Sequence, residues 1–405
     1  MTAESVPLNA VATVIRGVTF DKTEAVDAPQ DGYLPILRAG NIADQLLLEH
    51  DLVWVPETRV AIEQRMRPDD IAICMSSGSQ SVVGKTAPLL HEWNGSVGAF
   101  CAILRPKTAH ILPAYLSYFL KSEVFRSWTR QSTGANIKNI RKTELESFPV
   151  PLVSLEKQRR IVDLLSRAEG IVRLRREAQA KAQAIIPALF LDMFGDPATN
   201  PEGWPVLPLG KLLRNGPTNG LYKHKSAYGS GTPILRIDAF YDGKVRDLTQ
   251  LKRVALDGET ERDRFALAPG DIVINRVNSP EYLGKSALIP ALEEATVYES
   301  NMMRFAIDTQ QVLPEFVIAL LQQPASRQHF LAYAKHAINQ SSINQQDVKS
   351  LPVIVPPVDG QTRFKEHVTS LEAVMRRQAE MLKKAEVTFH ALLLHTFGWS
   401  MLDAK

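Results

Sequence analysis

The chain contains two long matching stretches, KQRRIVDLLSRAEGIVRLRREAQAKAQAIIPALFLDMF at residues 157–194 and GQTRFKEHVTSLEAVMRRQAEMLKKAEVTFHALLLHTF at residues 360–397. Apolar residues stand at matching positions, 203 residues apart. Within each stretch their spacing mostly alternates between four and three residues, as in the seam of a coiled coil. The matched pairs are Ile161 and Phe364, Leu165 and Val368, Ala168 and Leu371, Val172 and Met375, Ala182 and Ala385, Ile186 and Phe389, and Leu189 and Leu392. The pattern predicts two long helices.

Both stretches end in Phe-Gly, at Phe194-Gly195 and Phe397-Gly398. Glycine is common just past a helix end. At about 1.5 Å per residue, each helix would be roughly 50–60 Å long. Pro187 is expected to kink the first helix or to split off its last one or two turns. Each helix alone could pack on its own domain, but a matched pair favours a spacer between two modules.

The repetition extends beyond the helices. Each long helix is preceded by a copy of one globular unit, so the chain is a tandem duplication of a unit of about 200 residues, too long for a solenoid repeat. The matching segments are 35–38 with 233–236, 68–71 with 269–272, 84–87 with 284–287, 112–113 with 313–314, and 148–150 with 351–353. Their offsets drift by only a few residues, which loops absorb.

The globular part of the first copy reads as mixed α and β. Short apolar runs predict strands at 35–38, 70–73 and 99–104. Pro113 is expected to open a helix over 114–122, because proline suits a first helical turn. The run 148–151 contains two prolines and therefore predicts an extended edge rather than a central strand.

The totals restrict the class of protein only loosely. The net charge of +3 neither demands nor excludes nucleic acid, because a basic face can be hidden in a balanced total. Two cysteines, Cys74 and Cys101, cannot make a disulfide framework or a four-cysteine zinc site. No signal segment or run of about 20 apolar residues is present, so we expect no membrane span and a cytoplasmic protein.

Three motifs resemble catalytic or cofactor sites and fail on inspection. Gly78 to Thr86 has five residues where the phosphate-binding loop needs four. Asp196-Pro197-Ala198-Thr199 lacks the aromatic residue of an adenine methyltransferase motif. Pro68-Asp69-Asp70 lacks the further residues of a nuclease metal site. The sequence therefore predicts no catalysis and no cofactor in this chain.

The loops differ between the two copies although the strands match. Polar residues in these loops and at the strand ends suit DNA, because arginine can pair with guanine, asparagine or glutamine with adenine, and lysine with phosphate. The predicted DNA-binding residues are Arg38, Asn41, Ser77, Gln80, Lys85, Asn136, Lys138, Arg141, Arg236, Arg276, Asn278, Lys285, Gln340, Ser341, Asn344 and Gln345. The alternative interpretation of each loop is a solvated turn. Two domains that share a scaffold but differ in their loops are expected if each domain recognises a different target.

The whole chain resembles a specificity subunit of a type I restriction-modification system. The resemblance depends on the order of globular domain and long helix, repeated once, and on the proline-rich run Phe148-Pro149-Val150-Pro151 leading into Gln158-Arg159-Arg160-Ile161. The turn from Gly134 to Arg141 and the restart at Gly203-Trp204 also fit. The second copy departs from the pattern, because Asp359-Gly360-Gln361-Thr362-Arg363-Phe364 replaces the acidic-Gln run.

The resemblance implies an α+β fold with two target recognition domains, at 1–152 and 197–356, and two spacer helices, at 153–196 and 357–405, that form an antiparallel coiled coil. Each domain would read one half of a bipartite, asymmetric site in double-stranded DNA, and helix length would set the gap. Two methyltransferase subunits would dock on the helices, and motor-nuclease subunits could join them. S-adenosylmethionine, ATP and magnesium would belong to those partners, and the chain itself would be non-catalytic.

Two other functions fit parts of the sequence. A coiled-coil scaffold would bind a protein partner without sequence-specific DNA binding. A degenerate DNA methyltransferase would bind S-adenosylmethionine by itself. Divergent polar loops argue against the scaffold, and the missing motifs argue against the enzyme.

Overall fold

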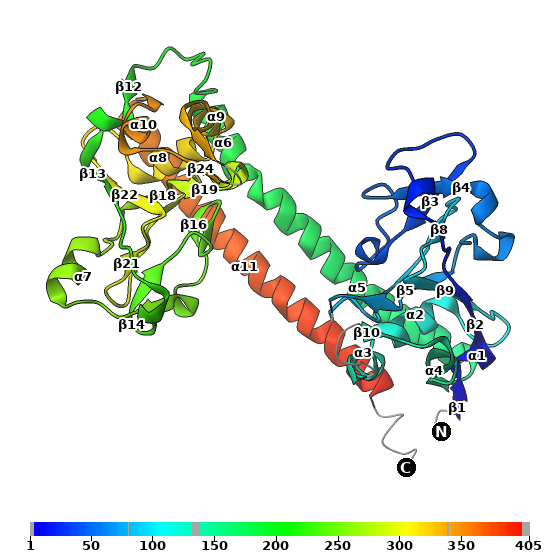
Figure 1. Ribbon diagram of the computed structural model, residues 1–405. Helices are drawn as coiled ribbons and strands as arrows, with labels where there is room; N and C mark the ends of the chain where they lie inside the picture. The colour runs from blue at the N-terminus through cyan, green and yellow to red at the C-terminus, as the bar shows by residue number, and fades with distance from the viewer. Residues whose placement is uncertain (1–3, 80, 132–137, 338–339, 399–405) are drawn as a thin grey trace. The chain divides into compact units, whose positions relative to one another are not determined.

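The computed structural model describes residues 4–79, 81–131, 138–337 and 340–398 (Figure 1). The chain divides into two compact units. Unit 1 comprises Met1–Arg176 with Glu380–Lys405, and unit 2 comprises Glu177–Ala379. Each unit combines sheets and helices, so the tandem α+β architecture predicted from the repeat is confirmed.

Unit 1 is built on a four-stranded antiparallel sheet in the order β2-β9-β5-β7. The strands are β2 (Ala12–Arg16), β9 (Cys101–Pro106), β5 (Ile71–Cys74) and β7 (Thr86–Pro88). A smaller sheet contains β4 (Val53–Pro56), β3 (Tyr33–Leu37) and β8 (Ser96–Val97). Every residue of β5 is buried, because the strand is covered on both faces. The strands predicted at 35–38, 70–73 and 99–104 thus correspond to β3, β5 and β9.

Helices α2 (Pro113–Lys121) and α3 (Glu123–Gln131) belong to the main core of unit 1. The helix predicted to open at Pro113 is confirmed. The predicted edge at 148–151 is β11 (Pro149–Leu152), which pairs only with β1 (Glu4–Pro7) in a two-stranded sheet. Short helices α1 (Leu8–Val11) and α4 (Lys142–Glu146) complete the unit's globular part.

Unit 2 repeats this plan with a larger sheet, in the order β13-β22-β18-β20-β16-β15. Its strands are β13 (Leu213–Asn219), β22 (Met302–Ile307), β18 (Ile272–Asn275), β20 (Ser286–Leu288), β16 (Gly243–Val245) and β15 (Phe240–Tyr241). A second sheet contains β17 (Lys252–Val254), β14 (Tyr228–Leu235) and β21 (Val297–Tyr298), and β12 (Val206–Pro208) pairs with β25 (Pro352–Ile354). The helices are α7 (Glu259–Phe265), α8 (Pro314–Leu321), α9 (Pro324–Tyr333) and α10 (Gln345–Lys349).

The long helices are α5 (Leu155–Gln183), α6 (Ile185–Phe194) and α11 (Val358–Phe397). The break between α5 and α6 falls at Ala184, three residues before Pro187. A proline ring clashes with the carbonyl four residues earlier, here that of Gln183, so the predicted split is explained. Helix α11 begins at Val358, the counterpart of Leu155, so the altered run after it leaves the helix start unchanged.

Each unit contains the beginning of one long helical stretch and the end of the other: α5 with the end of α11 in unit 1, and the start of α11 with α6 in unit 2. In unit 1, Leu165 of α5 shares a core with Leu393 and Phe397 of α11. In unit 2, the rings of Phe190 and Phe194 of α6 lie 5.8 and 5.5 Å from that of Phe364 in α11. Since early residues meet late ones, the helices run antiparallel within each unit.

One buried glutamine at each helix start ties the helix to its globular part. The Gln158 carboxamide accepts a hydrogen bond from Leu112 N at 2.8 Å and donates to His110 O and Val153 O. Its counterpart Gln361 accepts from Leu313 N at 2.8 Å and donates to Gln311 O and Pro356 O. Both glutamines are 0% exposed. Leu112 and Leu313 are the N-cap residues of α2 and α8, so each glutamine also satisfies a free helix-terminal N–H.

Candidate nucleic-acid interface

In unit 1, two polar segments that are distant in sequence form one small sheet. Strand β6 (Ser76–Ser77) follows the buried strand β5 directly, and it pairs antiparallel with β10 (Lys138–Asn139). Ser77 faces Lys138 in the register, and Ser76 faces Asn139. The structure therefore brings together parts of the two loops in which the sequence predicts DNA-binding residues.

Unit 2 builds the same feature from different residues. Strand β19 (Val277–Asn278) pairs with β24 (Gln340–Ser342), which also pairs with β23 (Lys335–Ala337). Asn278 faces Ser341 in the register. Three predicted residues, Asn278, Gln340 and Ser341, thus lie in one sheet, and the sheet follows the buried strand β18.

The backbone that positions these small sheets is the same in both units. Ile140 N donates to Met75 O at 2.8 Å, and its counterpart Ile343 N donates to Arg276 O at 2.9 Å. Both isoleucines are buried and act as anchors for the polar segments. The backbone arrangement is the same in both units, while the residue types in the small sheets differ.

The predicted residues at these sheets differ in their exposure and in the hydrogen bonds that their side chains already make. Gln340 is exposed, whereas Ser341 is buried. Asn278 Oδ1 accepts from Ser279 N at 2.9 Å, and Ser77 Oγ accepts from Ser79 N at 3.2 Å. Arg276 donates through Nη1 to Ser300 O at 3.2 Å.

Short helices follow the small sheets and hold three more predicted residues. The Arg141 side chain is 78% exposed and lies 3.6 Å from a carboxylate oxygen of Glu144. Its counterpart Asn344 caps α10, accepting from the backbone N–H groups of Gln346 and Asp347. Gln345 is exposed on the first turn of α10. The side-chain oxygen of Asn344 therefore stabilises the start of α10. The polar composition of the loop did not reveal this structural role.

Three other predicted residues do not belong to the small sheets, and neighbouring groups of their own units engage their side chains. Asn41 is 1% exposed; its Oδ1 accepts from Arg38 N at 2.8 Å, and its Nδ2 donates to Leu47 O and His50 O. Arg38 forms an ion pair with Asp51 at 2.6 Å. Arg236 pairs with the buried carboxylate of Glu299 at 3.1 Å. Asn41 in particular has its whole carboxamide engaged inside the protein, which leaves no base-reading group.

The Gly-Lys motifs form turns that begin β7 and β20. Gly84 and Gly284 have φ of +76° and +74°, and a side chain there would collide with Thr129 of α3 or Phe330 of α9. These contacts explain the glycines without a bound phosphate.

The Lys285 side chain is partly buried in unit 2. It donates to Ile237 O at 2.6 Å and lies over the rings of Tyr241 and Tyr282, 3.8 and 5.2 Å from their centroids. Burial lowers the pKa of Lys285 to about 8, assisted by the charge of Arg246. Lys285 thus has a contact within unit 2, and its phosphate contact stays a prediction. Lys85 occupies the equivalent turn in unit 1, partly exposed.

Gln80 and Asn136 lie outside the described residues, as does the side chain of Lys138. For these three positions the DNA contact stays a prediction.

The acidic residues examined as a metal site are used structurally. Asp70 is 1% exposed and forms two hydrogen bonds with the guanidinium of Arg105, at 2.9 and 2.7 Å. Burial raises the pKa of its counterpart Asp271. Within the described part of the chain, no group of three or more His, Cys, Asp or Glu side chains is placed to hold a metal ion.

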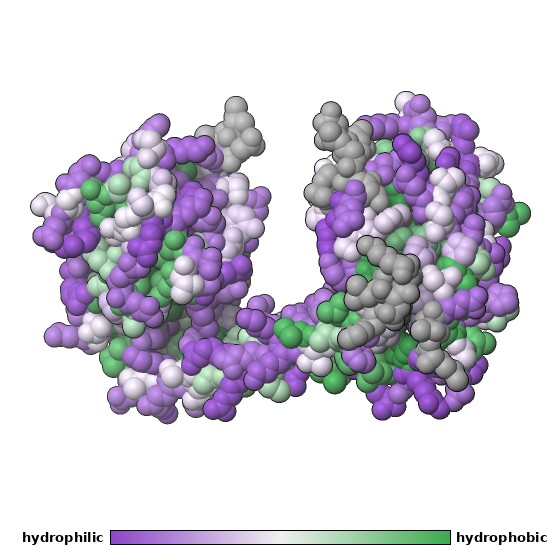
Figure 2. Space-filling model, turned by 90° about the horizontal axis from the view of Figure 1, so that it is seen from below, coloured by the Kyte–Doolittle hydropathy of each residue, from purple (hydrophilic) through white to green (hydrophobic). Residues whose placement is uncertain are grey.

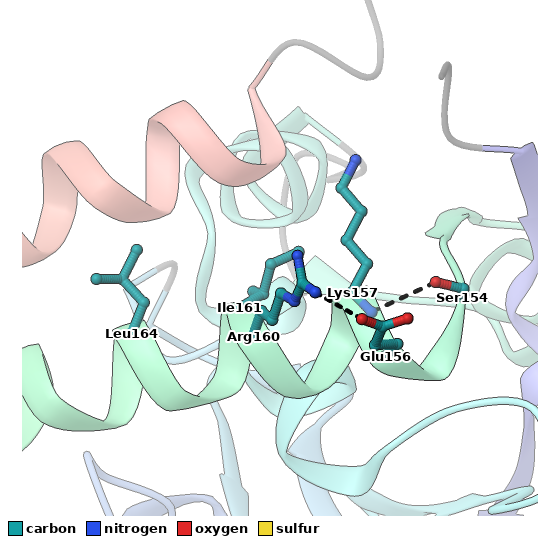
Figure 3. Close-up of a pocket in the computed structure, with 6 residues that line it drawn as sticks. All are labelled: Ser154, Glu156, Lys157, Arg160, Ile161 and Leu164. Carbon is teal, nitrogen blue, oxygen red and sulfur yellow. Dashed lines mark hydrogen bonds and ion pairs between the residues drawn. The ribbon is translucent and has the colours of Figure 1, made fainter.

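A hollow of about 450 Å³ lies beside the first turns of α5 (Figure 3). Its lining residues are Ser154, Glu156, Lys157, Arg160, Ile161 and Leu164. Glu156 and Arg160 pair with each other at 2.6 Å, so the two charges are already matched. The hollow offers a helix surface rather than a cluster of groups aimed at a small ligand.

Comparison with known proteins agrees with this architecture. The family described as type I restriction modification DNA specificity domain matches residues 2–183. The specificity subunit of the type I restriction enzyme EcoKI from Escherichia coli is 32% identical over 382 residues, covering 91% of this chain and 81% of that protein. The chain belongs to the type I restriction enzyme specificity subunits. The StySPI specificity subunit from Salmonella potsdam is 31% identical with the same coverage.

The fold of this specificity subunit also matches a solved structure. A chain from a type I restriction-modification system superimposes with a TM-score of 0.59, at 17% identity, covering 98% of this chain and 97% of that one. This likeness concerns the fold alone. No helix in the described ranges has the length and apolar character needed to span a membrane.

Proposed function

We propose that the chain is a DNA specificity subunit in which each unit reads one half of a bipartite, asymmetric target. The observation that carries this proposal is the small polar sheet in each unit. Both sheets are held by equivalent backbone hydrogen bonds, yet they are built from Ser-Ser and Lys-Asn in unit 1 and from Val-Asn and Gln-Ser-Ser in unit 2. Kept scaffolds with altered polar side chains fit two readers with different base preferences.

The residues that we assign to DNA are those at or next to these sheets. In unit 1 they are Ser77, Lys138 and Arg141, with Gln80 and Asn136 on the same loops. In unit 2 they are Arg276, Asn278, Gln340 and Gln345. Lys and Arg groups would hold phosphates and fix the register, while the amide and hydroxyl groups would read base edges.

The long helices supply the surface for protein partners. Their exposed apolar residues recur at equivalent positions: Ile171 and Val374 are 51% and 54% exposed, and Leu191 and Leu394 are 43% and 56% exposed. Hydrophobic residues are visible among the hydrophilic ones at the surface of each unit (Figure 2). Exposed apolar surface can mark an interaction site, and we assign these positions to one. Because the surface occurs twice in the chain, it fits two copies of one methyltransferase subunit.

In this assignment the chemistry belongs to the partners. S-adenosylmethionine would be bound by the methyltransferase subunits, and ATP and magnesium by motor-nuclease subunits where these join. The chain itself would position these partner subunits on DNA.

Methylome sequencing tests the proposal directly. A host that expresses the chain together with its neighbouring methyltransferase is compared with a host that lacks only the chain. We expect one bipartite methylated motif that appears only when the chain is present. Methylation that is unchanged without the chain would refute the proposal and favour the scaffold alternative.

A further inference from the structure

A tight turn lies against the small sheet in each unit, and no residue of it is among the predicted DNA-binding residues. In unit 1 Cys101 N donates to Gly98 O at 2.8 Å, which closes a turn with Ala99 and Phe100 at its apex. In unit 2 Met302 N donates to Glu299 O at 3.1 Å, which closes the equivalent turn with Ser300 and Asn301 at its apex. Each turn links the short strand β8 or β21 to the long strand β9 or β22.

Backbone hydrogen bonds hold each turn beside the polar sheet. Phe100 O accepts from Met75 N at 2.8 Å and from Ser76 N at 3.0 Å. Asn301 O accepts from Arg276 N at 2.8 Å and from Val277 N at 3.3 Å. Ser76 and Val277 are the first residues of β6 and β19, so the apex residue of the turn adjoins the first residue of each small sheet.

The side chains at this shared position have opposite character. Phe100 is 69% exposed, although no turn geometry calls for a phenyl ring there. Asn301 is partly exposed, and within the described residues its carboxamide has no hydrogen-bond partner. The change does not extend to both residues that donate to the turn, because Met75 and Ser76 of unit 1 correspond to Arg276 and Val277 of unit 2. At the apex position itself, the exposed side chain is apolar in unit 1 and polar in unit 2.

We infer that Phe100 and Asn301 are specificity-determining residues, Phe100 contacting the C5 methyl group of a thymine and Asn301 making a two-point contact with an adenine. Apolar side chains recognise the thymine methyl in the major groove, and asparagine pairs with the N6 and N7 positions of adenine. A partner base also explains why a large phenyl ring is left exposed beside a polar sheet. The inference rests on the proposed function, because it requires the small sheets to face DNA.

The test uses the chain assembled with its methyltransferase and a duplex that carries the methylome-defined motif. Uracil replaces each thymine of the unit 1 half-site in turn, which removes only the methyl group. At one position we expect about four-fold weaker binding, the effect of one buried methyl group. The Phe100→Ala variant should bind thymine and uracil duplexes equally at that position and be unchanged at the others.

A matched control removes another exposed apolar side chain of unit 1. Leu90 is 65% exposed and adjoins Leu89, which pairs through the backbone with Asp69 and Asp70 at the opposite end of β5. Leu90→Ala should keep the wild-type response to uracil. For unit 2, purine replaces adenine at each position, and Asn301→Ala should abolish a preference of about ten-fold or more at one of them.

The outcomes separate the inference from the proposed function. Uracil discrimination that persists in Phe100→Ala, or adenine discrimination that persists in Asn301→Ala, would overturn the inference while the wild-type complex still prefers its motif. A unit 1 half-site in which no thymine responds to uracil would overturn it as well. A wild-type complex that binds motif and scrambled duplexes equally would instead refute the proposed function.

Discussion

Replacing Gln158 by methionine tests whether one buried carboxamide joins each long helix to its globular part. Methionine has a similar length and no hydrogen-bonding group, so the Gln158→Met variant keeps the volume and removes the polar contacts. Those contacts are Leu112 N to Oε1 at 2.8 Å, and Nε2 to Val153 O at 2.8 Å and to His110 O at 3.1 Å. The site is 0% exposed, so water cannot replace them without rearrangement.

The expected cost follows from the backbone groups that lose their partner. One N–H and two carbonyl groups become unsatisfied, and a buried unsatisfied polar group costs roughly 1–3 kcal/mol. Carbonyl groups tolerate this better than N–H groups, and the methionine regains some apolar burial. We therefore expect the variant to lose about 2–5 kcal/mol of local stability, a large share of the roughly 5–15 kcal/mol of a typical domain.

The assay is native-state hydrogen exchange of the Leu112 amide, combined with chemical denaturation. In the wild type this amide is protected by Gln158, and in the variant its exchange should accelerate by more than ten-fold. A midpoint alone is insufficient because a chain with two units need not unfold in a single step. The equivalent Gln361→Met variant should accelerate exchange of the Leu313 amide and leave that of Leu112 unchanged.

Gln183→Met supplies the control, because Gln183 is an exposed residue at the end of the same helix. It should leave the Leu112 amide protected. If Gln158→Met exchanged at the wild-type rate and lost less than about 1 kcal/mol, the reasoning about the buried glutamine would be wrong.

Four further predictions concern single sites. Phe397→Ala should destabilise unit 1 by roughly 3–5 kcal/mol in denaturant unfolding, because its buried ring packs 5.5 Å from the rings of both Tyr115 and Phe119; a loss under 1 kcal/mol would contradict the packing. Asn41→Ala should destabilise unit 1 by about 1–3 kcal/mol while the methylated motif stays the same, and a changed motif would show that Asn41 reads DNA. The pKa of Lys285 is lowered to about 8, so between pH 8 and 10 the folded chain has lost this proton while the unfolded chain still binds it. The free energy of unfolding of unit 2 should therefore rise over this range, and the rise should be absent in Lys285→Met. Ile171→Glu and Val374→Glu should each reduce the number of bound methyltransferase subunits from two to one in native mass spectrometry, and unchanged stoichiometry in both would contradict the assigned docking surface.

The sequence predicted the repeat and most of the elements because these depend on local patterns. The spacing of apolar residues marked the long helices, and Pro187 marked the break between α5 and α6. Strand β5 could be predicted because its residues form a continuous apolar run. Internal comparison of the two copies supplied a second reading of each element, which a single domain would not have offered.

The sequence could not show which distant segments meet. The pairing of β6 with β10 joins residues about 60 apart, and nothing in either segment alone specifies the other. The sequence also did not show that each unit contains the beginning of one long helix and the end of the other. That arrangement depends on Phe397 packing in the core of unit 1 and Phe194 in the core of unit 2.

Residue type also misled where a polar group serves the fold. Asn41 has the amide that could read adenine, but its neighbours use every part of that amide. The Lys285 ammonium, which the sequence predicts to face phosphate, also contacts a carbonyl and aromatic rings of unit 2. Conversely, Phe100 carries no polar group, and its place beside the small sheet was visible only once the turn was folded.

Domain exchange tests the central claim most directly. Residues 1–152 are replaced by the matching part of another specificity subunit, and the methylome of a host that expresses the chimera with the methyltransferase is sequenced. If each unit reads one half of the target, one half of the methylated motif changes and the other half is retained. A motif that is wholly retained, or in which both halves change, would contradict the claim that the two units read DNA separately.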